Sequence, residues 1–494
     1  MNTIVNTPAA VSRPLRPNLV LAICCLSLLM VSMDATIVNV ALPSIRRDLG
    51  ASISGLQWVI DAYTMVVASL LMFAGSMADR FGRRRIFQAG MSLFMLGSLL
   101  CSLAPGIHAL VAFRVIQALG AAMLNPVAMS IIVNTFTEPK ARARAIGVWG
   151  AVAGISMALG PPIGGALTQG IGWRSIFWIN LPIGAAAIVL AALYISESKA
   201  PRARRVDPVG QFLVFAALAA LTYAVIEGPR MHWTSLTIIG LFATSLAAVI
   251  GILLYEPRRV DPLLDLRFFR SVPFSSAAAI AVFSFAAFAG FLFLNALYLQ
   301  EVRGLSSFRT GLCTLPLALA TIVCSPLSGR LVGAYGTRPS LLIAGVAMAL
   351  SAFILTHLSA DSQLGTLMLA YVIFGIGFGS VNAPITNTAV SGMPKAQAGL
   401  AAAVASTSRQ VGASLGVAVA GTIVGAQAAG GASFPEATHA FWWLMLGAGL
   451  MVLVLGLLSS SGWARASSQR AANLMEDPSP MAAGKRTSPA SAGK

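Results

Sequence analysis

Long apolar runs recur along almost the whole chain, and they constrain the fold more than any other feature of the sequence. Each run has about 20 residues, enough for a helix to cross the roughly 30 Å hydrocarbon core of a bilayer. Only 10% of the 494 residues are charged, and the mean hydropathy is +0.81, whereas about a quarter of the residues in soluble domains are charged. The runs are continuously apolar rather than alternating, which excludes a transmembrane β-barrel. The sequence therefore predicts an all-α polytopic membrane protein.

Charged or Gly/Pro-rich breaks divide the chain into fourteen predicted spans. An even number of spans places both termini on the same side of the membrane. The expected bounds are 19–43, 55–78, 86–104, 107–134, 145–168, 174–196, 209–228, 235–255, 273–299, 310–333, 340–358, 364–389, 400–428 and 438–462.

The basic residues indicate which side that is. With cytoplasmic termini, most of the 33 Lys and Arg residues fall in cytoplasmic segments, and Arg114 and Arg409 lie within spans. Such a bias is the positive-inside pattern. Residues 1–18 and 463–494 are then cytoplasmic tails, and we expect the second, rich in Ser, Ala, Pro and Lys, to be disordered. The outer loops hold only Arg46, Arg47, Arg174, Arg230, Arg303 and Arg309.

The net charge of +17 does not indicate a nucleic-acid partner. The basic residues separate the apolar runs instead of gathering on one face or tail, as a phosphate-binding surface requires. The five cysteines lie in apolar runs and are expected to be buried thiols. The four histidines fall in separate outer loops, so no metal site is predicted.

The sequence contains an internal repeat. The stretch "GSMADRFGRRR", which begins at Gly75, is echoed by "GRLVGAYGTRP", which begins at Gly329, and "RVIQALGAAMLNP" is echoed by "YVIFGIGFGSVNA" at nearly the same offset. With cytoplasmic termini, the loops that contain the Gly75 and Gly329 stretches both lie on the cytoplasmic side. The two halves are therefore predicted to be parallel repeats of six spans, as in rocking-bundle transporters. The predicted organisation is an N-terminal six-helix bundle at 19–196, two inserted helices with linkers at 197–272, and a C-terminal six-helix bundle at 273–462.

Three ionisable side chains share one depth in the N-terminal half. Asp34, Asp61 and Arg114 lie about 14, 9 and 10 Å from the outer ends of their spans, at a rise of 1.5 Å per residue. A charge near the bilayer centre costs about 2.5–3.5 kcal/mol on insertion scales, so such residues usually pair or face a cavity. We expect these three residues to form one site. The alternative for Asp34 is a structural acid satisfied by Thr36, Asn39 or a neighbouring helix.

Five motifs occur in the order of one known family: "MDATIVNVALP", "GSMADRFGRRR", "LVAFRVIQALGAA", "GISMALGPPIGG" and "GWRSIFWINLP". Over residues 19–462 the chain resembles the major facilitator superfamily, and within it the fourteen-span drug:proton antiporters of EmrB/QacA type. The resemblance implies the major facilitator fold and proton-coupled multidrug efflux by alternating access. It also implies a multi-pass protein of the bacterial inner membrane, with no cofactor because the proton motive force drives transport. The expected partners are protons, membrane lipid and lipophilic, cationic or amphipathic compounds.

The resemblance also implies roles for single residues. It ties Arg114 to proton coupling, and Asp34 and Asp61 to coupling or to a cationic substrate. "GSMADRFGRRR" is expected to be a cytoplasmic gate, in which Gly75 permits close helix packing, Gly82 permits a turn, and Asp79 caps a helix or pairs with Arg80 or Arg83. "GISMALGPPIGG" marks antiport exporters, and its residues are Gly154, Gly160, Pro161, Gly164 and Gly165.

Four further polar residues are candidates for the wall of a cavity: Gln117, Asn295, Asn382 and Arg409. Arg409 has no acid in the spans of the second half to pair with, so carbonyls, a substrate anion and the interface all remain open as its partners.

Other functions fit the sequence less well. A dedicated exporter of one metabolite or antibiotic, or a solute:proton symporter, would keep the same fold. A membrane enzyme would need clustered His, Asp or Cys, and an ATP-driven pump would need GxxxxGK[ST]; the sequence has neither. A periplasmic adaptor and an outer-membrane channel are candidate partners that the sequence leaves open.

Overall fold

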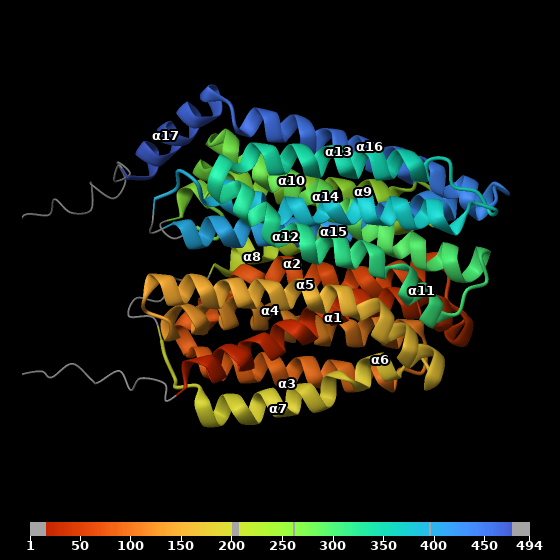
Figure 1. Cartoon of the computed structure of the whole chain (residues 1–494), viewed down its shortest axis with the longest axis horizontal. Helices are drawn as coiled ribbons and strands as arrows, with labels where there is room; N and C mark the ends of the chain where they lie inside the picture. Colours follow the sequence, from red (N-terminus) through yellow and green to blue (C-terminus); the bar gives the residue numbers. More distant parts are fainter. Residues whose placement is uncertain (1–15, 200–206, 260–261, 395–396, 477–494) are drawn as a thin grey trace, which may run out of the picture. The chain divides into compact units, whose positions relative to one another are not determined.

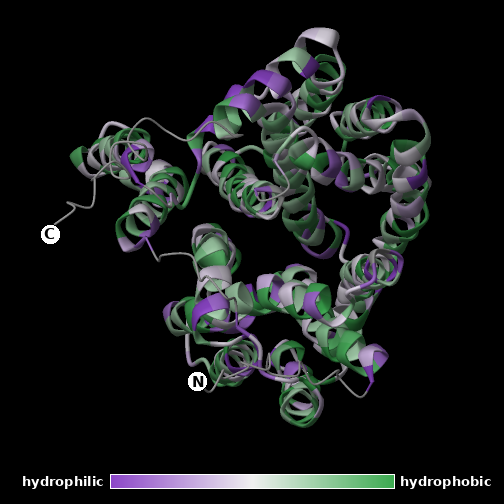
Figure 2. Ribbon diagram, turned by 90° about the vertical axis from the view of Figure 1, so that its left-hand side faces the viewer, coloured by the Kyte–Doolittle hydropathy of each residue, from purple (hydrophilic) through white to green (hydrophobic). Residues whose placement is uncertain are grey.

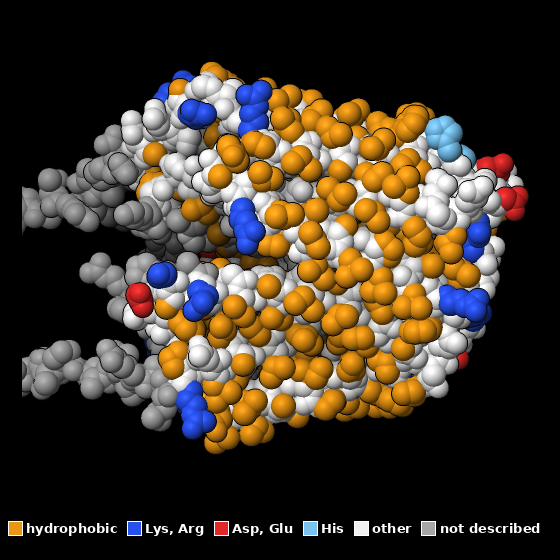
Figure 3. All heavy atoms as spheres, in the orientation of Figure 1, with side chains coloured by type: hydrophobic (Ala, Val, Ile, Leu, Met, Phe, Trp, Pro, Cys, Tyr) orange, Lys and Arg blue, Asp and Glu red, His pale blue; other side chains and the backbone are white. Residues whose placement is uncertain are grey.

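The computed structural model describes residues 16–199, 207–259, 262–394 and 397–476. These residues are almost entirely helical, and no strand occurs among them (Figure 1). Fourteen helical segments are long and apolar enough to cross a membrane, which confirms the predicted number of spans. Hydrophobic residues dominate the helices in Figure 2. On the face seen in Figure 3 they cover the middle of the helices, while Lys and Arg lie near the helix ends.

The first compact unit, unit 1, consists of Met1–Val206 and Gly304–Leu312. Within it α4 packs against α2 and α3, and α1 packs against α4, α5 and α7. The predicted sixth span is divided into α6 and α7. The helices of the unit are α1 (Pro17–Leu49), α2 (Ile53–Phe81), α3 (Arg83–Ser102), α4 (Ile107–Thr135), α5 (Pro139–Gly170), α6 (Ser175–Trp178), α7 (Asn180–Tyr194) and most of α11 (Ser307–Cys313).

Unit 2 consists of Asp207–Arg303 and Cys313–Lys494. In it α10 packs against α15, α13 packs against α14 and α16, and α8 packs against α9. Its helices are α8 (Pro208–Met231), α9 (Leu236–Tyr255), η1 (Glu256–Arg258), η2 (Leu266–Arg270), α10 (Val272–Leu297), the π-helical η3 (Tyr298–Val302), α12 (Leu315–Tyr335), α13 (Thr337–Leu355), α14 (Leu364–Val390), α15 (Ala398–Ala429), α16 (Phe434–Ser459) and α17 (Gly462–Glu476). The predicted division into two bundles and an inserted pair stays a prediction.

Local sequence determines several of the helix ends. Ser52 caps α2, where its hydroxyl accepts a hydrogen bond from the Gly55 N–H at 3.1 Å. The chain turns between α2 and α3 at Gly82, whose φ of 112° is a conformation that other residues rarely adopt. Gly82 is therefore the turn residue that the sequence predicts.

The prediction of a disordered tail from residue 463 is wrong for its first part. Gly462–Glu476 form α17, because Ala, Arg, Gln, Leu and Met in this segment favour helix. One face of α17 is buried through Ala464 and Ala471, and Ser467 Oγ accepts a hydrogen bond from the Val272 N–H at 3.0 Å. Residues 477–494 and most of the predicted N-terminal tail lie outside the described residues.

Candidate functional site

A buried ion pair joins α1 and α4 in unit 1. Arg114 donates from its NH1 group to Asp34 Oδ2 at 2.5 Å, and the two residues expose only 1% and 0% of their surface. Arg114 Nε donates to the Val59 carbonyl at 3.1 Å, and the guanidinium lies 4.1 Å from the centre of the Tyr63 ring. Asp34 and Arg114 lie together, as the sequence predicts. Neither Thr36 nor Asn39 is a partner of the Asp34 carboxylate among the described residues, and the groups that satisfy it come from neighbouring helices, which the structural alternative also allowed.

Side chains from three helices complete the environment of this carboxylate. Gln117 Nε2 donates to Asp34 Oδ1 at 2.8 Å and to Ser98 Oγ at 2.9 Å, while Gln117 Oε1 accepts from Arg114 NH1 at 2.6 Å. Asn180 Nδ2 reaches Asp34 Oδ1 at 3.4 Å and Ser98 Oγ at 3.3 Å. We call Asp34, Ser98, Arg114, Gln117 and Asn180 the Asp34 cluster. All five are buried, so every hydrogen bond in it acts in a medium of low dielectric constant.

Ser98 and Asn180 were not predicted as site residues. Asn180 stands in the quoted motif "GWRSIFWINLP", where an amide inside an apolar span was a usable signal. Ser98 gave no such signal, because serine is common in membrane helices as a small packing residue.

Glycines bring α3 and α4 close enough to form the cluster. A Cβ atom on Gly97 would overlap the backbone of Gln117, and a Cβ atom on Gly120 would lie 2.8 Å from the Phe94 Cα atom. Both positions therefore require glycine. The close approach places Gln117 beside Ser98 on the neighbouring helix.

Asp61 does not join the Asp34 cluster, which corrects the expectation of a three-residue site. It is fully buried on α2, and Thr64 Oγ1 lies 3.4 Å from Asp61 Oδ1. Val59 and Tyr63 on the same helix face Arg114. Asp61 is two residues from each of them, about 200° around a helix of 3.6 residues per turn. Its side chain therefore leaves α2 on the face opposite Tyr63.

The glycine–proline motif on α5 packs against the turn of α1 that carries Asp34. A Cβ atom on Gly160 would lie 3.2 Å from the Met33 carbonyl oxygen, and one on Gly164 would lie 3.0 Å from the Ile37 carbonyl oxygen. The Thr36 hydroxyl lies 3.3 Å from the Met157 carbonyl across the same contact. These glycines therefore fix how closely α5 approaches α1.

The other face of the motif packs against α11. A Cβ atom on Gly165 would lie 2.9 Å from the Phe308 Cα atom, and one on Gly311 would overlap the Pro161 carbonyl. Gly154 has no neighbour within 4 Å of its Cβ position, so the structure gives no packing reason for that glycine.

The motif "GSMADRFGRRR" forms a turn that is held by two acids. Asp79 Oδ1 accepts from Arg83 NH2 at 2.9 Å, one of the two pairings expected. Glu197, which was not predicted, accepts from the Arg84 N–H at 3.1 Å and the Arg85 N–H at 3.2 Å, at the first turn of α3.

Two other residues of this motif differ in their surroundings. A Cβ atom on Gly75 would be 3.9 Å from Pro126, an ordinary contact, so the close helix packing expected there is not present. The Arg80 guanidinium lies 5.7 Å from the Phe81 ring centre.

The polar candidates of unit 2 do not form one cluster. Asn295 is buried and accepts a hydrogen bond from the Tyr371 hydroxyl on α14. Asn382 donates within its own helix to the Phe378 carbonyl at 3.4 Å. Arg409 donates to Thr386 Oγ1 at 2.6 Å, and no ion pair of Arg409 occurs in the described part of the chain.

The sequence matches a family of known proteins. The model of the Major Facilitator Superfamily matches residues 24–417. Multidrug resistance protein Stp of Mycobacterium tuberculosis is 40% identical over 402 residues, 81% of this chain and 74% of the relative. The tetracenomycin C resistance and export protein of Streptomyces glaucescens is 36% identical over 434 residues, 88% and 80% of the two chains. The methylenomycin A resistance protein of Streptomyces coelicolor is 35% identical over 400 residues, 80% and 83%.

Proposed function

Since the chain belongs to the major facilitator superfamily, we propose that it exports lipophilic, cationic or amphipathic compounds in exchange for protons. The names of its relatives, which include multidrug resistance and export proteins, support efflux. The chain is a multi-pass membrane protein, and its described residues contain fourteen helical segments able to span a bilayer. The positive-inside pattern supports a plasma-membrane orientation with both termini in the cytoplasm.

The observation that carries proton coupling is the buried pair of Asp34 and Arg114. An ionised Asp34 is held by Arg114, Gln117 and Asn180, so the carboxylate ties α1 to α4 and α7. A proton on Asp34 removes the charge that Arg114 compensates. Arg114 then keeps the Val59 carbonyl, Gln117 Oε1 and the Tyr63 ring as partners, and α1 loses its strongest polar link to α4.

The packing of α5 gives a route by which this change reaches other helices. α1 contacts α5 through Gly160 and Gly164, and α5 contacts α11 through Pro161 and Gly165. Because these contacts have no space for side chains, a displacement of α1 must be followed by α5. In the proposed cycle, protonation and export alternate through this movement.

A panel of dyes and antibiotics tests efflux directly. Cells that make the chain should accumulate less of the exported compounds, and collapse of the proton gradient should raise accumulation to the level of cells without it. Gradient-independent export would defeat proton coupling, and a lower accumulation after collapse would indicate uptake by symport. The purified chain in liposomes, without adaptor or outer-membrane channel, shows whether those partners are required.

A dedicated exporter of one compound is the second candidate. Relatives named for tetracenomycin C and methylenomycin A favour it. Export of a single member of the panel would support this candidate over multidrug efflux.

A further inference from the structure

The two halves of the internal repeat differ at one structurally equivalent point. In unit 1 the loop after Gly82 starts α3, and the Glu197 carboxylate accepts hydrogen bonds from the first backbone N–H groups of that helix. A Cβ atom on Gly82 would lie 2.5 Å from Glu197 Oε1, so the carboxylate fills the space in front of the turn. A helix N-terminus favours an anion at this place because its N–H groups are unpaired and its dipole is positive.

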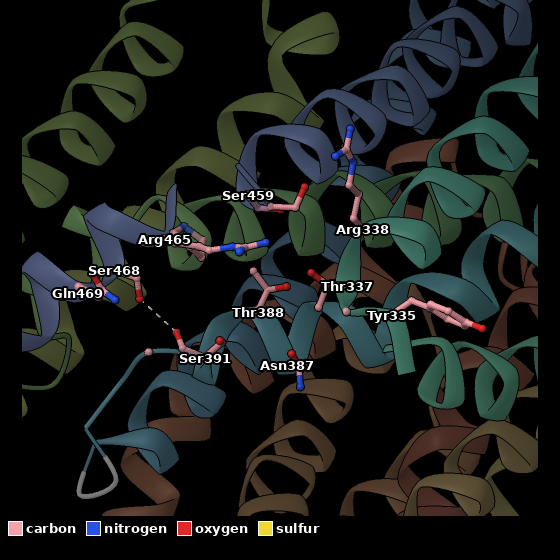
Figure 4. Close-up of a pocket in the computed structure, with 14 residues that line it drawn as sticks. Tyr335, Thr337, Arg338, Asn387, Thr388, Ser391, Ser459, Arg465, Ser468 and Gln469 are labelled. Atoms are coloured by element: carbon pink, nitrogen blue, oxygen red, sulfur yellow. Dashed lines mark hydrogen bonds between the residues drawn. The ribbon is translucent and has the colours of Figure 1, made fainter. Parts of the chain in front are cut away.

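The corresponding turn in unit 2 is open. Gly336 has φ 78° and precedes α13, and no side chain caps that helix. The Cβ position of Gly336 has no neighbour within 4 Å. In place of a carboxylate there is a cavity of about 490 Å³. It lies between the first turn of α13, the last turns of α14 and α16, and α17 (Figure 4).

The lining of the cavity is basic and rich in hydroxyl groups. Arg338 and Arg465 line it together with Thr337, Thr388, Ser459 and Ser460, and none of its lining residues is acidic. Neither arginine forms an ion pair with any residue that the structure describes. Figure 4 shows the Arg465 side chain extending between Ser459 and Thr388. α14 and α16 bring C-terminal carbonyls to the same place, so the charge that makes the cavity attractive to an anion comes from Arg465, whereas the Arg338 side chain extends away from Thr388 (Figure 4).

The cavity also contains a buried hydroxyl group that is free to donate a hydrogen bond. Thr388 exposes only 3% of its surface, and its Oγ1 atom has no hydrogen-bond partner among the described residues. An unpaired buried hydroxyl costs about 1–3 kcal/mol, so native structures rarely keep one without a partner. Thr388 lines the cavity, where a bound oxyanion could accept its hydrogen bond.

We propose that this cavity binds a phosphate group, carried by an anionic phospholipid or by a soluble phosphate. A guanidinium group, here that of Arg465, hydroxyl donors and a helix N-terminus are groups that bind phosphate in proteins. The topology predicted from the basic residues places this end of the helices at the cytoplasmic surface, where basic pockets between helices meet anionic headgroups. Trp463 and Leu474 on α17 are 63% and 43% exposed, as expected for a helix at the lipid interface.

Thermal unfolding of the purified full-length protein in detergent tests this site. The probes are phosphatidylglycerol, phosphatidylcholine as the lipid without net charge, and inorganic phosphate. Phosphatidylglycerol is expected to raise the unfolding midpoint more than phosphatidylcholine. Arg465→Gln should weaken the apparent affinity for phosphatidylglycerol, obtained from the midpoint over a range of lipid concentrations, about tenfold, the usual loss for one charge-assisted hydrogen bond. Arg470→Gln, on the same helix but outside the cavity, should leave it unchanged.

A second variant separates ligand binding from folding. Thr337→Glu places a carboxylate at the first turn of α13, as Glu197 does at α3 in unit 1, and should abolish the response while the midpoint without lipid is kept. A midpoint raised by inorganic phosphate alone identifies a soluble phosphate as the occupant, and one raised only by phosphatidylglycerol identifies the lipid. Equal responses in Arg465→Gln and Arg470→Gln, or no response to either probe, would overturn the proposal.

Discussion

Replacing Arg114 by glutamine removes the cation beside a fully buried carboxylate. Asp34 and Arg114 are 0% and 1% exposed, so water cannot replace the lost partner. Removing one member of such a buried pair costs about 3–5 kcal/mol. Gln117 and Asn180 still donate to the carboxylate at 2.8 and 3.4 Å, which places the expected loss near the lower end of that range. Arg114→Gln should thus lower the free energy of unfolding by about 3 kcal/mol.

The double variant Asp34→Asn/Arg114→Gln measures the interaction energy between the two residues, apart from the contacts that each makes with its other neighbours. It leaves no uncompensated charge, so its loss should be smaller than the sum of the single losses by about 2 kcal/mol, within the range for residues in contact. Reversible unfolding in mixed detergent micelles measures these free energies. Arg309→Gln, at an exposed arginine without an ion pair among the described residues, should change stability by less than about 0.5 kcal/mol. Additive single losses would refute the reasoning.

Three other predictions concern packing, the α3 turn and topology. Gly160→Leu forces a side chain against Met33 and Thr36 and should reduce both export and the free energy of unfolding, the latter by about 1–3 kcal/mol. The control Gly154→Ala has free space around the new methyl group and should alter neither quantity. Equal effects of the two variants would contradict the packing argument. Glu197→Gln should lower the free energy of unfolding by about 0.5–2 kcal/mol, because the charged cap of α3 is lost, whereas an unchanged stability would show that the cap is dispensable. In a variant without native cysteines, Arg470→Cys should react with a membrane-impermeant thiol reagent only from the cytoplasmic side. Labelling from outside would contradict the predicted topology.

The number of spans was predictable because an apolar run of sufficient length has few alternatives to a membrane helix. The pairing of Asp34 with Arg114 was predictable for a related reason: a buried charge needs a partner, and depth along each helix follows from residue number. Direction around the helix does not follow from depth. Asp61 was expected at the depth of the pair, but its side chain leaves the other face of α2, which only the contacts of Val59 and Tyr63 reveal.

Contacts between segments that are distant in the sequence could not be predicted either. Glu197 follows the sixth predicted span, and nothing in its neighbourhood indicates that it caps α3. Asn295 was a cavity candidate, yet the Tyr371 hydroxyl satisfies it. The helix α17 was not predicted because the composition of the whole tail is typical of a disordered segment, whereas its first part contains good helix formers.

The central claim is that Asp34 couples proton movement to export. This claim is tested in proteoliposomes that contain the purified chain and one exported dye from the panel. Two quantities are measured: dye accumulation driven by an imposed pH gradient, and dye exchange without a gradient. In Asp34→Asn, the account predicts that exchange persists while gradient-driven accumulation is lost. Gradient-driven accumulation at the parent level in Asp34→Asn would contradict it.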